Sequence, residues 1–275
     1  MAGFYNFWQV ILRLLERCRA HRVGRHSAEV TYYLLFTLFP FVVFLYSAVS
    51  VFDVQVLEVL DRLLPVLPED VYELISEYLS HVGKQNSSFV LYVGSVLAVY
   101  MLYRAVSSLN YAVRRATDSP HAAGRRRLLL SLGISLVVMI SVFVLLIMFG
   151  ISRDIYRYLA LFFELGAGFG IAANVIRYAA GPIFLFFALG VYYYLLDECN
   201  RPYKHYLLGA LFAVSVWYAF SAGFMVYTNN YGSYSSVYGS LAAIMALMVW
   251  LHTTSMSFIM GAELNSILRQ NKING

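Results

Sequence analysis

Residues 237–262 read VYGSLAAIMALMVWLHTTSMSFIMGA, and this run decides the fold class. About 20 apolar residues at ~1.5 Å each cross the ~30 Å hydrocarbon core of a bilayer as a helix, so the run predicts a transmembrane helix. Its second half carries His252 and several hydroxyl side chains, and Glu263 follows directly. Polar groups gain nothing from contact with lipid. One face of the helix is therefore expected to look onto protein or a cavity.

The composition of the whole chain indicates the same fold class. Hydrophobic residues make up 60% and charged residues 13%, which inverts the balance of a soluble globular domain. Membrane spans and short connections then use most of the 275 residues. We expect one membrane domain, residues 1–275, with no separate soluble catalytic domain.

Apolar segments of spanning length recur along the chain, so we expect an all-α polytopic membrane protein with six transmembrane helices. The predicted spans cover residues 28–52, 89–113, 128–151, 178–196, 206–228 and 237–262. Residues 53–88 hold two short amphipathic segments and predict a helical cap on the outer face, and residues 263–275 form a predicted cytoplasmic tail. Pro40 and Pro182 lie inside two of the spans and predict helix breaks, because proline lacks the N–H of a helical hydrogen bond.

The first segment, residues 1–26, predicts an amphipathic helix on the cytoplasmic side. Apolar side chains recur in it at helical spacing, at Phe4, Trp8, Ile11, Leu15 and Cys18. Arginines are interspersed among them, and a basic amphipathic helix is typical of a segment that lies on an anionic membrane surface. We therefore expect this helix to lie on the membrane rather than to cross it.

The distribution of lysine and arginine orients the six predicted spans. Fourteen of the 20 basic residues lie in the N-terminal segment, the second-to-third loop, the fourth-to-fifth turn and the tail, against five in the opposite loops. The positive-inside rule places the richer side in the cytoplasm, so both termini are expected there. Cys18 and Cys199 fall on this reducing side and are expected to be free thiols.

Three polar residues lie at matching positions of three predicted spans. Arg104, Tyr193 and His252 each follow the outer start of their span by 15 residues, which is about 22 Å at ~1.5 Å per residue. We expect them to form one polar layer in the inner half of the membrane. They are candidate contacts for a substrate or lipid.

Arg104 has two interpretations at this depth, where a charge costs about 2.5–3.5 kcal/mol unless it is paired or hydrated. In the structural interpretation it turns toward the inner surface or pairs with a carboxylate, for which Glu29 and Glu263 are candidates. In the functional interpretation its planar guanidinium contacts an anion such as a phosphate head group. His252, a lone histidine among hydroxyl residues, is either a hydrogen-bonded core residue, which we favour, or part of a proton relay.

Two weaker patterns concern helix packing and the outer rim. Ala219 and Gly223 have the spacing of small residues that lets helices approach closely. Tyr231, Tyr238 and Gly239 lie around the loop before the sixth span and predict an outer rim, which is either an interfacial tyrosine belt or a binding site.

Three segments carry a resemblance to a known family. They are AEVTYYLLFTLFPFVVFL near the N-terminus, the R-x5-N pattern at Arg104 and Asn110, and the YGS and GAELN ends of the sixth span. Over nearly the whole chain the sequence resembles the YihY/BrkB family of bacterial inner-membrane proteins. The resemblance implies six helices, an inner-membrane location and an envelope-related role. Proteins similar to this have been connected with virulence and with movement of lipids, and Asn110 joins Arg104 as a candidate lipid contact.

Members of that family have also carried a ribonuclease label, which the residues do not favour. The six histidines are scattered without an HxH or HxxxH pair for a metal ion. The sequence also lacks a glycine loop with lysine for nucleotide phosphates and a GxSxG nucleophile motif. We expect no enzymatic activity, no metal or other cofactor, and no nucleic-acid partner.

The leading hypothesis is a transporter or flippase-like protein for an anionic lipid or lipid-linked envelope precursor, with anionic membrane lipids as its partners. Arg104 would contact the head group, and Glu29 and Glu263 would hold it or alternate with it. The alternative is a non-transporting scaffold or assembly factor for envelope machinery, which would have an envelope protein as its partner.

Overall fold

The computed structural model describes residues 2–50, 88–117, 129, 131–137, 167–197, 202–230 and 240–273, and within them every regular element is a helix. The elements are α1 (Ala2–Ala20), α2 (Val23–Ser50), α5 (Ser88–Ala116), α7 (Ala167–Leu196), the 3-10 helix η1 (Tyr203–His205), α8 (Leu207–Asn230) and α10 (Ser240–Ile273). The all-α prediction is confirmed for this part of the chain.

Three helices in the described ranges are long and apolar enough to cross a membrane. They are Tyr92–Ala116 in α5, Leu207–Tyr227 in α8 and Ile244–Gln270 in α10, and they correspond to the predicted second, fifth and sixth spans. A shorter apolar helix, Gly181–Leu196 in α7, lies within the predicted fourth span. The predicted first span lies in α2 as far as Ser50.

Several predicted segments lie outside the described residues. These are the outer cap apart from its last residue, the third span from residue 138 onward, and the loop with Tyr231, Tyr238 and Gly239. At the other end of the sixth span, α10 runs on to Ile273. The predicted tail therefore begins as a continuation of the same helix, and Glu263 is a helical residue.

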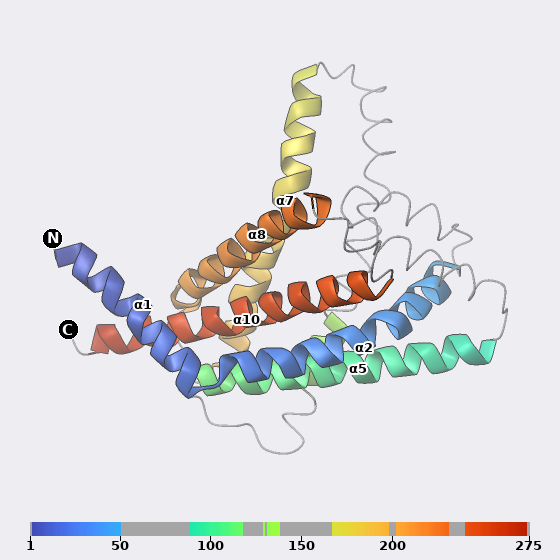
Figure 1. Ribbon diagram of the computed structural model, residues 1–275, viewed down its shortest axis with the longest axis horizontal. Helices are drawn as coiled ribbons and strands as arrows, with labels where there is room; N and C mark the ends of the chain where they lie inside the picture. Colours follow the sequence, from blue (N-terminus) through green and yellow to red (C-terminus); the bar gives the residue numbers. More distant parts are fainter. Residues whose placement is uncertain are drawn as a thin grey trace.

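Figure 1 shows α8, α10, α2 and α5 arranged side by side in that order, with α7 crossing α8 steeply. α1 and the C-terminal end of α10 lie at the same end of this bundle (Figure 1), and the two helices are in contact. The largest buried core lies toward this end, where α5 and α7 finish and α8 begins. It includes Val113, Leu189, Tyr193, Ala210 and Ala262.

α8 and α10 approach each other most closely at two glycines. A Cβ added to Gly209 would collide with the carbonyl oxygen of Gly261, and one added to Gly261 would lie 2.6 Å from the Gly209 oxygen. A side chain at either position would push the helices apart. Among the described residues, the close contact predicted at Ala219 and Gly223 does not form, because Ala219 is exposed and a Cβ on Gly223 would meet nothing within 4 Å.

The two prolines do not divide their helices. Pro40 lies inside α2 and Pro182 inside α7, and each helix continues through its proline as one element. The ribbon of α2 bends in the half that contains Pro40 (Figure 1). The chain turns sharply at the α1–α2 junction (Figure 1), where Arg22 has a φ of 53°, in the left-handed region.

Candidate functional site

Arg104 lies at the midpoint of a membrane-length helix and faces outward. It is 12 residues from either end of the stretch Tyr92–Ala116, which is about 18 Å at ~1.5 Å per residue. Its side chain is exposed on the surface of the bundle. The guanidinium Cζ lies 4.9 Å from the centre of the Tyr33 ring, and Nη2 donates a hydrogen bond to the Tyr33 hydroxyl. The arginine is thus held by α2 while it remains accessible from the side of the bundle.

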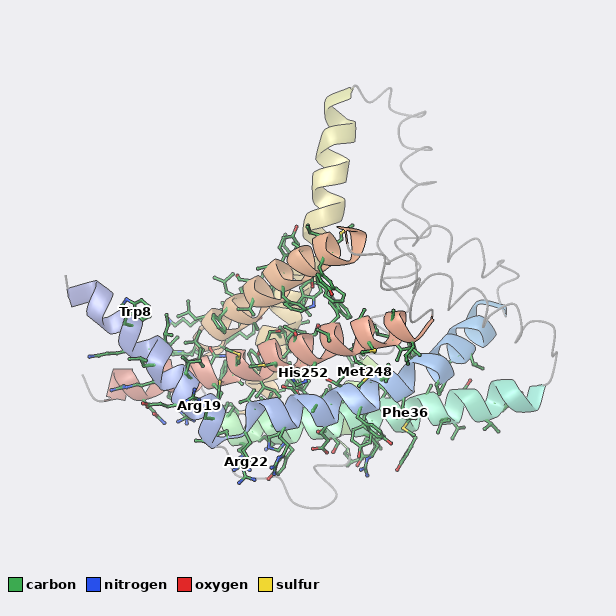
Figure 2. All side chains as sticks on the ribbon, in the orientation of Figure 1. Trp8, Arg19, Arg22, Phe36, Met248 and His252 are labelled. Atoms are coloured by element: carbon green, nitrogen blue, oxygen red, sulfur yellow. The ribbon has the colours of Figure 1, made fainter. Side chains whose placement is uncertain are left out.

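The surroundings of Arg104 are aromatic and exposed. Tyr100, one turn earlier on α5, has 51% of its surface exposed. On α2 the rings of Tyr32 and Phe36 pack 4.7 Å apart beside Tyr33. Figure 2 shows Phe36 on the part of α2 that runs beside α5. We call the exposed surface formed by Glu29, Tyr33, Tyr100 and Arg104 the lateral face.

Glu29 supplies a carboxylate on this face. It precedes Tyr33 by four residues, so the two side chains lie on the same side of α2. His26 Nδ1 lies 3.9 Å from Glu29 Oε2. Burial first, and then the charge of Arg115, lower the pKa of His26, so this histidine is neutral at pH 7. His26 therefore supplies no positive charge to the half-exposed Glu29 carboxylate.

Asn110 is a packing residue in the interior. Its side chain is buried, donates to Ser131 Oγ at 3.0 Å and accepts from the Tyr192 hydroxyl at 2.8 Å. These bonds join α5 to α7 and to the described residues 131–137. Asn110 lies six residues beyond Arg104 and points inward, whereas Arg104 points outward. The R-x5-N pattern therefore spans two different environments.

The polar layer expected from residue counting does not form as one site. The Tyr193 side chain is fully buried, and its hydroxyl donates to the Phe258 carbonyl oxygen at 2.6 Å, which joins α7 to α10. His252 is half-buried in the middle of α10 (Figure 2). Across the residues that the structure describes, no hydrogen bond or ion pair connects Arg104, Tyr193 and His252.

A second polar site lies at the end of the bundle that holds the termini. The Glu263 side chain is fully buried, with Oε2 2.8 Å from Arg17 Nε and Oε1 2.6 Å from His21 Nδ1. Arg17 Nη2 also donates to the Ala116 carbonyl oxygen at 2.9 Å and to Ser266 Oγ at 3.2 Å. We call Arg17, His21, Glu263 and Ser266 the Glu263 cluster. It ties α1 to α10 and to the last residue of α5.

The partners of Glu263 differ from those expected. The sequence makes Glu263 a candidate partner of Arg104, but it pairs with Arg17 and His21, while Arg104 contacts Tyr33. A buried carboxylate requires compensation, because desolvation of an unpaired charge is costly. Arg17 and His21 are four residues apart, and the His21 N–H donates to the Arg17 carbonyl oxygen at 2.8 Å, so the last turn continues past α1 and both side chains lie on one side. Two basic residues four positions apart in the N-terminal segment, together with a carboxylate in an otherwise apolar helix, form the sequence pattern that could have predicted the pairing with Glu263.

Other residues of the GAELN segment also join helices at this end. Asn265 Oδ1 accepts the Gly209 N–H at 2.8 Å, and its Nδ2 donates to the Tyr206 carbonyl oxygen at 3.2 Å. The Tyr206 hydroxyl donates to Asp197 Oδ2 at 2.9 Å, and Arg269 donates to the Thr117 carbonyl oxygen at 2.7 Å. Asn265 therefore joins α10 to the start of α8, and Arg269, further along α10, binds the residue that follows α5.

Cys18 lies beside the Glu263 cluster, outside the membrane-length helices. Burial first, and then the Glu263 carboxylate, raise the pKa of its thiol to about 11, although Arg17 acts in the opposite direction. The thiol is therefore protonated at neutral pH and a weak nucleophile. Among the described residues, no group of three His, Cys, Asp or Glu side chains could hold a metal ion.

Comparisons with known proteins point to one family. The family described as Virulence factor BrkB matches residues 14–275. The chain is 24% identical to the putative ribonuclease-like protein YfkH of Bacillus subtilis, over 94% of both chains. It is 27% identical to a UPF0761 membrane protein of Photobacterium profundum, over 94% of this chain and 80% of the relative. A UPF0761 membrane protein of Aeromonas salmonicida is 26% identical, over 92% and 86%. No solved structure matches the chain.

Proposed function

Because this chain belongs to the Virulence factor BrkB family and is a membrane protein with several spans, we propose that it moves an anionic amphiphile across the bacterial inner membrane. The cargo is an anionic lipid or a lipid-linked envelope precursor, and the protein acts as a transporter or flippase-like protein. Movement of such a cargo involves no chemical step and requires no cofactor or nucleic acid.

The position of Arg104 carries the proposal. An arginine at mid-membrane costs about 2.5–3.5 kcal/mol unless something compensates its charge. Tyr33 contributes a ring face and a hydroxyl, which are neutral, so the guanidinium keeps its net charge. A phosphate that reaches the lateral face from the surrounding lipid could accept two parallel N–H bonds from it. This arrangement suits a headgroup that passes along the outside of the α2–α5 pair.

Glu29 gives the lateral face a second function in the proposed mechanism. It lies one helical turn from Tyr33 toward the α1–α2 junction, so an anionic headgroup and the Glu29 carboxylate compete for the same cation. The guanidinium would turn to Glu29 when no cargo is bound and to the phosphate when cargo arrives. Such an exchange avoids an uncompensated charge in either state.

We also propose an orientation of the protein in the membrane. The described basic residues of α1, of the α1–α2 junction and of the ends of α5 and α10 belong to elements that meet at one end of the bundle (Figure 1). The positive-inside rule assigns that end to the cytoplasm. Both termini are then cytoplasmic, and Glu29 lies on the cytoplasmic side of Arg104.

The test is lipid movement in proteoliposomes with Arg104→Gln. Dithionite reduction of a fluorescent phosphatidylglycerol analogue measures the rate, and the matching phosphatidylcholine analogue reports charge selectivity. We expect Arg104→Gln to slow phosphatidylglycerol movement about tenfold or more, since ~1.4 kcal/mol from a charge-assisted pair is a factor of ten.

The matched control is Lys204→Gln, which removes an exposed positive charge in η1, outside the membrane-length helices. It should leave the rate unchanged. An Arg104→Gln protein that folds and moves phosphatidylglycerol at the wild-type rate would remove Arg104 from the mechanism. If a stoichiometric envelope protein also crosslinks to the chain, the scaffold function becomes the better account.

A further inference from the structure

α1 presents two different faces, and the Glu263 cluster uses one of them. Leu14, Cys18 and His21 follow one another at intervals of four and three residues and lie on one side of the helix, with Arg17 beside them. Leu14 is buried, and Arg17 and His21 pair with Glu263. This side is the one by which α1 is attached to the bundle.

A second apolar stripe on α1 faces away from the attached side. Trp8, Leu12 and Leu15 are spaced by four and three residues, so they form one side of the helix. They are 55%, 56% and 50% exposed. The amphipathic face predicted from the sequence placed Leu15 and Cys18 together, whereas the structure assigns them to different sides. Exposed apolar side chains in a row on a terminal helix indicate that another surface covers them.

The charges next to the stripe identify the kind of surface. Arg19 continues the stripe four residues after Leu15, and Arg22 follows at the α1–α2 junction, and both are exposed. α1 has a single acidic residue, Glu16. Figure 2 shows Trp8 on the part of α1 that extends from the bundle, and Arg19 and Arg22 near the junction. An apolar stripe that ends in arginines is complementary to an anionic lipid surface.

The position of α1 along the long axis of the bundle is consistent with contact to a lipid surface. Arg17 contacts the carbonyl of Ala116, the residue at which the membrane-length stretch of α5 ends. α2 begins three residues after α1 ends. α1 therefore lies where two long helices leave the apolar region, which is the level of lipid headgroups.

We propose that the Trp8, Leu12 and Leu15 stripe of α1, with Arg19 and Arg22, docks onto the anionic lipid surface while Arg17 and His21 hold the opposite side to Glu263. α1 is then a strap between the lipid surface and α10, and the lipid composition at that surface acts on the position of α10. This inference does not depend on transport of any cargo.

The test places spin labels on the full-length protein in nanodiscs. Cysteines replace Leu12 or Leu15 on the stripe and Gln9 or Glu16 on the exposed polar side, in a background with Cys18→Ser and Cys199→Ser. Collision rates with oxygen and with a water-soluble nickel complex give a depth parameter for each label. With phosphatidylglycerol present, we expect a positive depth parameter at Leu12 and Leu15 and a negative one at Gln9 and Glu16.

Charge dependence provides the second arm of the test. Arg19→Gln combined with Arg22→Gln should shift the depth parameters of the stripe toward water in phosphatidylglycerol nanodiscs and leave them unchanged in phosphatidylcholine alone. Labels at Leu12 and Leu15 that meet the nickel complex as freely as Gln9 would overturn the proposal. Labels shielded from both oxygen and nickel would also overturn it, because they would show that protein or a second copy covers the stripe.

Discussion

Glu263 is the residue on which the arrangement at the terminal end of the bundle depends. It is the fully buried carboxylate of the α1–α10 contact, and its two oxygens have basic partners in Arg17 of α1 and in His21, the residue that follows α1. Removing one member of such a group leaves the other partly desolvated and unpaired. The stability of the α1 attachment should therefore respond to a change as small as Glu263→Gln.

We predict that Glu263→Gln lowers the free energy of unfolding by about 1–3 kcal/mol, because Arg17 loses its ionic partner while its side chain stays mostly buried. It should also lower the pKa of Cys18 from about 11, since the Glu263 charge contributes to that value. Thermal unfolding in detergent measures the first effect. The pH dependence of Cys18 alkylation, in a Cys199→Ser background, measures the second.

The matched control is Glu16→Gln, the same chemical change at an exposed position of α1. It should stay within about 0.5 kcal/mol of the wild type, as is usual for surface substitutions. In the wild type, alkylation should rise about tenfold per pH unit as the thiolate fraction grows below pH 11. Equal unfolding temperatures and equal alkylation profiles for both variants would show that the Glu263 pairs contribute nothing.

At the residue scale, the sequence predicts which helix carries each polar side chain but not the direction in which the side chain points. Counting from the span start predicted Arg104 in the inner half of its span, whereas it lies at the midpoint of the membrane-length stretch Tyr92–Ala116. Counting along separate helices cannot give their rotation about their own axes. Arg104 faces outward and Tyr193 inward for that reason, although both lie 15 residues into their predicted spans.

At the scale of elements, the contact between α8 and α10 rests on backbone proximity. Gly209 and Gly261 face each other, and the Gly209 N–H donates to Asn265. Small residues permit such approach, because a helix pair in lipid gains its stability from packing and hydrogen bonds. This pair of helices carries the Asn265 bonds that orient the start of α8.

We predict that Gly209→Ala destabilises the protein by about 1–3 kcal/mol, because the added methyl group collides with the Gly261 backbone and α8 must move away. Gly223→Ala, in the same helix, is the matched control. A Cβ there meets nothing within 4 Å, so the control should be neutral or slightly stabilising. Thermal unfolding of both variants in detergent measures the difference, and equal shifts would contradict the close α8–α10 contact.

The positions of the helices along the sequence were more predictable than any other feature of the fold. Apolar runs of spanning length predicted α5, α8 and α10, because hydrophobicity over about 20 residues is a strong local signal. The contacts between them were less predictable. The spacing of Ala219 and Gly223 is the same as that of many small-residue pairs, and only the three-dimensional pairing shows that Gly209 is the position that matters.

At the scale of the whole molecule, the described chain has two polar sites at different levels, the Glu263 cluster and the lateral face. The Glu263 cluster and the Asn265 bonds fasten α1, α5, α8 and α10 at the terminal end, and the lateral face lies about 18 Å along α5 from there, at ~1.5 Å per residue. α1 and the C-terminal end of α10 lie at the same end of the bundle (Figure 1), and the side of the membrane that this end faces stays a prediction from charge counting. A hydrogen-bonded terminal end together with an exposed arginine at the midpoint of a membrane-length helix is the arrangement from which we infer lipid movement along the α2–α5 pair.

The most direct test of that claim is photocrosslinking from the lateral face. A benzophenone amino acid at Tyr100, one turn from Arg104, is irradiated in nanodiscs of mixed phosphatidylglycerol and phosphatidylcholine, and mass spectrometry identifies the adducts. Tyr218, an exposed tyrosine on α8, is the control position. We predict that adducts at Tyr100 favour phosphatidylglycerol and that Arg104→Gln abolishes this preference, with no change at Tyr218. Adducts at Tyr100 that show the same lipid ratio with and without Arg104, or adducts to protein, would contradict the account.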